Sequence, residues 1–166
     1  MPFTPFHFGP ALALKAVAPR AFSWTAFVAS QVVIDCEPLY YMLRGDYPVH
    51  RVLHWFVGAT GAGLAAAVAC LLVVRLARRR TPERVVALAR RSTATAGELS
   101  TWAILLGGLV GGLSHPLLDG FMHADLTPLM PWSQWNPFLG AVGLVPIHLG
   151  CLAAALAGVI GLALRR

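Results

Sequence analysis

Histidine and aspartate residues recur in this sequence at intervals of four. His50 and His54 form one such pair, and His115, Asp119 and His123 repeat the interval twice. Residues four apart lie on the same face of an α-helix, so two imidazoles can point at one ion. Neutral imidazoles combined with carboxylates suit Zn²⁺, and also Fe or Mn. The spacing therefore predicts a divalent metal site, with Zn²⁺ as the first choice.

Further histidines and acids are candidates because the helices described below bring them to the same level. Together they supply enough ligands for two ions. A two-metal site can activate water and stabilise both the attacking and the leaving oxygen at a phosphoryl centre. The predicted metal ligands are His7, Asp35, His50, His54, His115, Asp119 and His123.

Three residues are candidates for a direct role in catalysis. Asp35 or Glu37 could relay the proton of an activated water. Arg51 could hold a phosphate through its guanidinium group, or it could simply reach toward the membrane interface. Glu37 has a second interpretation as a solvated helix end.

A buried hydrogen-bond network between helices is the alternative to a metal site. We expect His148 to be a packed or hydrogen-bonded histidine. Asp46 and Asp125 fall in loops and are expected to be solvated turn residues.

The composition is that of an integral membrane protein. Of the 166 residues, 57% are hydrophobic and only 12% are charged, whereas a soluble domain carries about 25% charged residues. Several apolar stretches reach the ~20 residues that cross a bilayer. The formal net charge of +6 comes largely from arginines in one loop. Membrane topology explains that loop better than contact with nucleic acid or anionic lipid, and no nucleic acid is expected as a partner.

We predict an all-α bundle of about five helical segments, one short and N-terminal and four spanning, in a single transmembrane domain over residues 1–166. An Arg-rich cytoplasmic loop over about 77–97 separates the third segment from the fourth, and Thr81-Pro82-Glu83 within it is typical of a helix start. The Pro- and Trp-rich stretch Asp125–Asn136 is expected at the membrane interface. The predicted segments are about Phe6–Ala18, Phe22–Leu43, Arg51–Leu76, Leu99–Met122 and Pro137–Leu164.

The basic residues indicate an orientation, because Lys and Arg concentrate on the cytoplasmic side. If the Arg-rich loop is cytoplasmic, Lys15, Arg20 and the two C-terminal arginines fall on the same side. That arrangement accounts for eleven of the thirteen basic residues. We predict a multi-pass protein of the inner membrane with a cytoplasmic C-terminus. The candidate metal ligands then gather at the non-cytoplasmic face.

Several short segments resemble those of a known family, the YdjM-like membrane-bound metal-dependent hydrolases. They are Thr4-Pro5-Phe6-His7, Asp35-Cys36-Glu37-Pro38, His50-Arg51, Leu129-Met130-Pro131-Trp132-Ser133 and, most specifically, Ser114-His115-Pro116-Leu117-Leu118-Asp119. The family has two histidines five residues apart, whereas His50 and His54 are four apart. Trp55 also stands where a small hydroxyl residue is usual. The resemblance implies a metal-dependent activity and leaves the substrate open.

These observations favour a metal-dependent hydrolase that acts on a phosphoester or a lipid headgroup at the non-cytoplasmic face. Membrane lipid is the expected partner, and a phospholipid is a candidate substrate. One alternative is a membrane di-iron oxygenase, although the six histidines include no adjacent pair. The other is a non-catalytic metal-binding or transport protein; the apolar stretches of the third and fourth segments disfavour a transport path.

Overall fold

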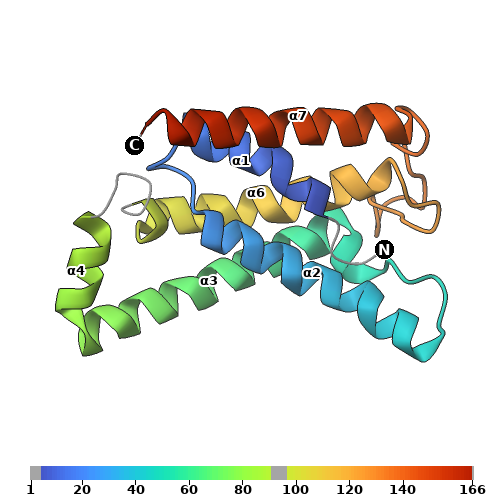
Figure 1. Ribbon diagram of the computed structural model, residues 1–166. Helices are drawn as coiled ribbons and strands as arrows, with labels where there is room; N and C mark the ends of the chain where they lie inside the picture. The colour runs from blue at the N-terminus through green and yellow to red at the C-terminus, as the bar shows by residue number, and fades with distance from the viewer. Residues whose placement is uncertain (1–4, 91–96, 166) are drawn as a thin grey trace.

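The computed structural model describes residues 5–90 and 97–165 and is all-helical over those ranges (Figure 1). Thr4, Arg91 and Arg166, which entered the sequence argument, lie outside them. The helices are η1 (Pro5–His7), α1 (Phe8–Val17), α2 (Trp24–Arg44), η2 (Val52–His54), α3 (Phe56–Arg80), α4 (Pro82–Arg90), α6 (Thr101–Gly120) and α7 (Leu144–Ala163).

Three of these helices, α3, α6 and α7, are long and apolar enough to cross a membrane. The chain is therefore an all-α membrane protein, as predicted. Helix α2 corresponds to the second predicted segment, which was also expected to span the membrane. It has 21 residues but is less apolar than α3, α6 and α7. Gln31, Asp35 and Glu37 lower its mean hydropathy, and their side chains turn toward the other helices.

Helix α6 is the centre of the bundle and packs against α2 on one side and α3 on the other. Its glycines permit this close approach. A Cβ atom at Gly108 would meet the backbone of Gly63 in α3, and one at Gly111 would meet the side chain of Ser30 in α2. Small residues allow helices to approach closely in membranes, where no hydrophobic effect drives them together.

Helices α1 and α7 form a second layer beside this core (Figure 1). They also meet through small residues, because a Cβ atom at Gly158 would meet the backbone of Leu12. An apolar cluster that contains Ala11, Phe22 and Phe27 links α1 to α2. This layer matters for the site because it carries η1, and with it His7, toward the end of α6.

A buried ion pair connects α1 to the segment before α6, at the end of the bundle away from η1. Lys15 Nζ lies 2.7 Å from Glu98 Oε1 and donates to the carbonyl of Phe22 at 2.6 Å. Glu98 also accepts hydrogen bonds from the backbone of Trp24 at 3.0 Å and Thr25 at 2.9 Å, and so caps α2. Burial raises the pKa of Glu98, but the hydrogen bonds from Lys15 and the α2 N-terminus outweigh it and hold the pKa below its usual value.

The helix bounds depart from the predicted ones mainly where polar contacts or glycines intervene. The third segment divides into η2 and α3, and α3 continues past Leu76 to Arg80. Helix α4 begins at Pro82, which confirms the helix start predicted inside the Arg-rich loop. The fifth segment begins at Leu144 rather than Pro137, because Gly140 has a positive φ of 70° that ends any helix there.

Candidate metal centre

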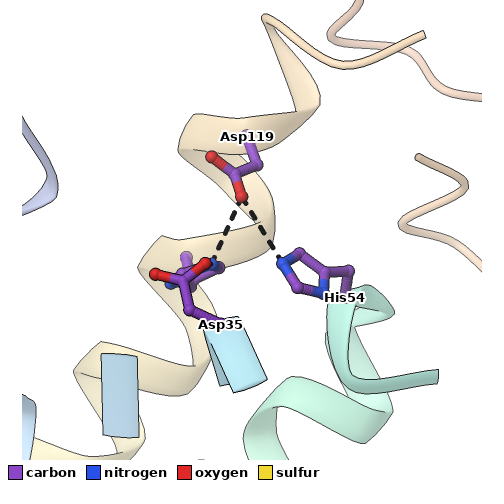
Figure 2. Close-up of side chains that lie close together, drawn as sticks. Asp35, His54 and Asp119 are labelled. Carbon is purple, nitrogen blue, oxygen red and sulfur yellow. Dashed lines mark ion pairs between the residues drawn. The ribbon is translucent and has the colours of Figure 1, made fainter. Parts of the chain in front are cut away.

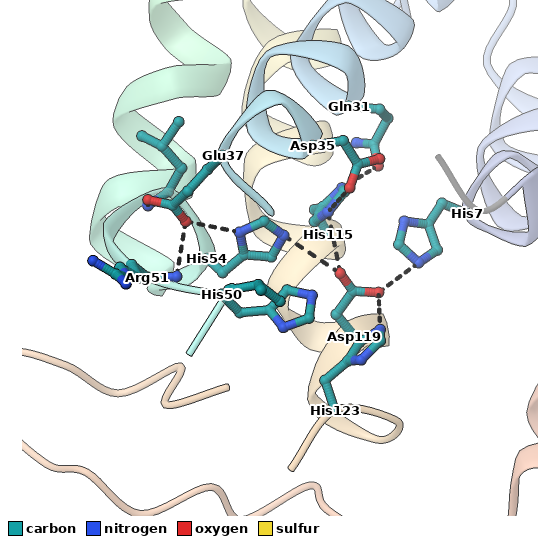
Figure 3. Close-up of polar contacts among 12 residues, drawn as sticks. His7, Gln31, Asp35, Glu37, His50, Arg51, His54, His115, Asp119 and His123 are labelled. Carbon is teal, nitrogen blue, oxygen red and sulfur yellow. Dashed lines mark hydrogen bonds and ion pairs between the residues drawn. The ribbon is translucent and has the colours of Figure 1, made fainter. Parts of the chain in front are cut away.

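The polar ends of several helices meet at one end of the bundle (Figure 3). Helix α2 contributes Gln31, Asp35 and Glu37, and α6 contributes His115 and Asp119. The loop before α3 contributes His50 and His54, while η1 adds His7 and the turn after α6 adds His123. The structure thus brings together all seven predicted metal ligands, from segments far apart in the sequence.

Four of these residues form what we call the inner cluster: Asp35, His54, His115 and Asp119. All four are buried, and each offers a ligand atom within 4.8 Å of the others. Asp119 Oδ2 lies 3.2 Å from His115 Nε2 and 3.6 Å from His54 Nε2 (Figure 2). Asp35 Oδ1 lies 3.4 Å from His115 Nε2.

These separations are those expected between ligands of one ion. Two ligands each about 2.0–2.2 Å from a tetrahedral ion lie about 3.4 Å apart. Moreover, the buried Nε2 atoms of His7, His54 and His115 make no well-aligned hydrogen bond among the described residues, although each lies 3.0–3.6 Å from a carboxylate oxygen of Asp119. Buried polar atoms are nearly always hydrogen-bonded, so three such atoms facing one carboxylate call for a physical explanation. A bound cation supplies one.

The other ring nitrogen of each inner-cluster histidine is held by an acceptor. His115 Nδ1 lies 2.7 Å from Gln31 Oε1, and the Gln31 amide nitrogen donates to the Gly111 carbonyl at 3.1 Å, which sets the orientation of the amide. His54 Nδ1 lies 3.1 Å from Glu37 Oε2. Because both partners accept, each Nδ1 carries a proton, and in the neutral ring Nε2 is then the nitrogen with the lone pair. This tautomer is the one that binds a metal through Nε2.

A second group, which we call the outer cluster, consists of His50, His123 and Asp125. The rings of His50 and His123 lie 4.2 Å apart, and His50 Nδ1 is 2.9 Å from Asp125 Oδ1. Burial lowers the pKa of both histidines. Burial raises the pKa of Asp125, but its contact with His50 brings the net value below normal. Neutral histidines beside a carboxylate are suited to a cation.

Asp119 belongs to the inner cluster and also faces the outer cluster, with a different carboxylate oxygen on each side. While Oδ2 faces His54 and His115, Oδ1 lies 3.0 Å from His7 Nε2 and 3.9 Å from His123 Nε2. A carboxylate in this position can bind two ions at once.

A family model described as Domain of unknown function (DUF4184) matches residues 1–163. The chain belongs to the DUF4184 family. No curated protein and no solved structure matches it. The description of the family names no activity, so the function has to be argued from the geometry of the site.

Two expectations about this DUF4184 chain were wrong. His50 and His54 do not share a face of an α-helix, because His50 lies in a loop and His54 ends η2. The Glu37 carboxylate accepts from the backbone N–H groups of Arg51 at 2.9 Å and Leu53 at 3.0 Å and holds this turn. The two rings still lie 4.7 Å apart. Asp125 is not solvated: its side chain is 8% exposed.

The remaining candidates in the DUF4184 structure take distinct positions. The side chain of Glu37 is 8% exposed, which excludes the solvated helix end. The guanidinium carbon of Arg51 lies 3.6 Å from the centre of the Tyr41 ring. Asp46 pairs with Arg44 at the surface, as a solvated turn residue would. His148 is half-buried on α7, where its ring centre lies 4.2 Å from that of Phe6 and its Nδ1 lies 2.7 Å from the Leu144 carbonyl, so it is the packed, hydrogen-bonded histidine that was expected.

Sequence reasoning missed Gln31 as a residue of this DUF4184 site. A signal was present, because Gln31 lies four residues before Asp35 and therefore on the same face of α2. It also missed the Lys15–Glu98 pair, for which the sequence gives no spacing signal.

Proposed function

We propose that this protein is a membrane-embedded metal-dependent hydrolase whose centre is the inner cluster. One observation carries the proposal: the buried side chains of Asp35, His54, His115 and Asp119 each offer a ligand atom within 4.8 Å of the others, and the Nε2 atoms of His115 and His54 face Asp119 Oδ2 at 3.2 and 3.6 Å. The alternative is a buried network of ion pairs between protonated histidines and these carboxylates, and the metal content of the protein decides between the two.

The ligand set is Asp35, His54, His115 and Asp119 for a first ion, with Zn²⁺ as the first choice and Fe or Mn as alternatives. The outer cluster is the candidate for a second ion, and Asp119 would bridge the two. A bound divalent ion lowers the pKa of a coordinated water and supplies a nucleophile at neutral pH.

The protein's own residues have three tasks in this scheme. Gln31 and Glu37 keep His115 and His54 in the tautomer that exposes Nε2. Glu37 is also placed to take a proton from His54 Nδ1. Arg51 lies in the same turn as His50 and His54, but its guanidinium group stacks on Tyr41 and its Nε donates to the Pro48 carbonyl at 2.8 Å, so it would have to leave both contacts to bind a phosphate at the clusters.

The substrate we propose is a phosphoester of a lipid headgroup. Trp132 and Trp135, in the loop between α6 and α7, are 79% and 68% exposed at the end of the bundle that holds both clusters. Exposed tryptophans are typical of the membrane interface. The Arg-rich segment at the opposite end favours a cytoplasmic side there, and hence a centre at the non-cytoplasmic face of the inner membrane. The resemblance to YdjM-like hydrolases supports the same function.

The test is the metal content of protein purified gently in detergent, together with hydrolysis of a short-chain phospholipid. We expect at least one tightly bound ion per chain. His115→Ala and Asp119→Ala should remove both the metal and the activity. His148→Ala is the matched control, because His148 lies outside both clusters and its nitrogen contacts a backbone carbonyl of its own helix. The absence of stoichiometric metal in the native protein would refute the proposal.

A di-iron oxygenase is the second candidate, because Asp119 faces two groups of histidines with two oxygens. Carboxylates that bridge two irons occur in helical di-iron proteins. An iron content of two per chain, with the optical absorption of an oxo-bridged pair, would favour it over the hydrolase.

A further inference from the structure

Helix α4 lies across the end of the bundle opposite the metal centre (Figure 1). It follows α3 after a single non-helical residue, Thr81, and its contacts with other described helices are concentrated at α3. A helix of nine residues is marginal in water by itself, since isolated helices need about 12–15 residues. Little of the protein is available to stabilise it.

Within the part of the chain that the structure describes, the apolar side of α4 is only partly covered, and Val85 on it is half-buried. Val86 is 49% exposed and Leu88 is 42% exposed, and Val85 lies beside them. Such residues normally pack on a core or insert into a membrane surface.

Exposed arginines lie near α4 in the sequence. Arg75, Arg79 and Arg80 lie at the end of α3, and Arg84 lies on α4, with Glu83 as the one acid of the described part of α4. Arg78 differs from them, because its guanidinium donates to the Leu99 carbonyl at 2.7 Å. Arg75, Arg79, Arg80 and Arg84 are all exposed, so their charges are accessible from outside the protein.

We propose that α4 and the arginine-rich end of α3 form a binding surface for anionic phospholipid headgroups. Helix α3 is apolar enough to cross the membrane, so its charged end emerges at the membrane surface and α4 begins within the headgroup layer. Basic residues beside an amphipathic helix are attracted to anionic lipids, while apolar residues insert between the headgroups. This surface lies at the other end of the protein and does not depend on the proposed hydrolase.

The test is amide hydrogen exchange of the full chain in nanodiscs of phosphatidylcholine alone or mixed with phosphatidylglycerol. Anionic lipid should slow exchange in residues 82–90, and added salt should reverse the effect. Arg84→Gln should reduce the protection conferred by phosphatidylglycerol by roughly fivefold. Arg44→Gln is the matched control, since Arg44 is an exposed arginine at the opposite end, and it should leave that protection unchanged.

The apolar side is tested separately. Val86→Ser should speed exchange in both kinds of nanodisc, because it weakens insertion rather than charge attraction. Equal exchange of residues 82–90 in the two lipids would overturn the proposal, as would an equal effect of Arg84→Gln and Arg44→Gln. Protection that appears only when RNA is added would point to a nucleic-acid partner and would also overturn it.

Discussion

Gln31 should control metal affinity without touching the metal. Its Oε1 atom lies 2.7 Å from His115 Nδ1, and its amide nitrogen is bonded to the Gly111 carbonyl. Gln31→Leu removes the acceptor and leaves the volume nearly unchanged. His115 can then rotate or move its proton to Nε2, and either change removes a lone pair from the inner cluster.

The expected magnitude follows from the role of such supporting residues. Loss of a hydrogen bond that orients a metal-binding histidine lowers affinity about 10- to 100-fold, or about 1.4–2.7 kcal/mol. Gln31→Glu restores an acceptor and should retain more of the affinity than Gln31→Leu. The free energy of unfolding should also fall by about 1 kcal/mol in Gln31→Leu, because the bond to Gly111 is lost.

The assay is competition for Zn²⁺ between the purified protein and a chelator of known affinity. Gln134→Leu is the matched control, since Gln134 is exposed in the loop between α6 and α7 and should bind Zn²⁺ like the wild type. The reasoning is refuted if Gln31→Leu binds Zn²⁺ as tightly as the wild type while His115→Ala does not bind it. In that case the Nδ1 contact does not set the tautomer of His115.

Three further predictions address the outer cluster, the ion pair and the glycine contacts. His123→Ala should reduce the metal content from two ions per chain to one by elemental analysis, because His123 belongs to the outer cluster alone; loss of both ions would contradict the division into two clusters. Glu98→Gln should lower the free energy of unfolding at neutral pH by about 3 kcal/mol, since it leaves the 6% exposed Lys15 side chain without its ion pair. The pKa of Glu98 is lowered in the folded state from an ordinary value of 4.5, so its stabilisation is complete above about that pH and is lost as the pH falls through the lower, folded-state pKa. Thermal unfolding should therefore be less sensitive to acid in Glu98→Gln, and an unchanged pH profile would count against this assignment. Gly108→Ala should lower the unfolding temperature in detergent by an amount equivalent to about 1–3 kcal/mol, because its methyl group would meet Gly63; Gly61→Ala, whose methyl group meets nothing within 4 Å, should not.

The sequence was informative wherever one property repeated along the chain. Continuous apolar stretches predicted the helices, and their spacing brought His115 and Asp119 to the same face of α6. The distribution of basic residues predicted that His7 and Asp119 lie at the same end of the bundle. The distance of 3.0 Å between His7 Nε2 and Asp119 Oδ1 confirms it.

The remainder depended on contacts that no periodic pattern encodes. The turn that holds His50 and His54 forms because Glu37, on another helix, binds its backbone N–H groups. Asp125 was predicted to be solvated because it lies in a loop. Its side chain is buried because it accepts hydrogen bonds from Val49 and His50, which lie about 75 residues earlier in the chain. The role of Gln31 likewise depends on a rotamer and on the carbonyl of Gly111.

The dependence of α2 on α6 has a consequence for biosynthesis. Gln31 and His115 are 84 residues apart, so α2 leaves the ribosome well before the helix that receives its polar side chains. An aspartate at the centre of a membrane helix opposes insertion by about 2.5–3.5 kcal/mol, and α2 carries Asp35 without His115 during that interval. Helix α2 should therefore complete its entry into the bilayer only after α6 has been synthesised, and a chain truncated before Thr101 should expose α2 to proteolysis.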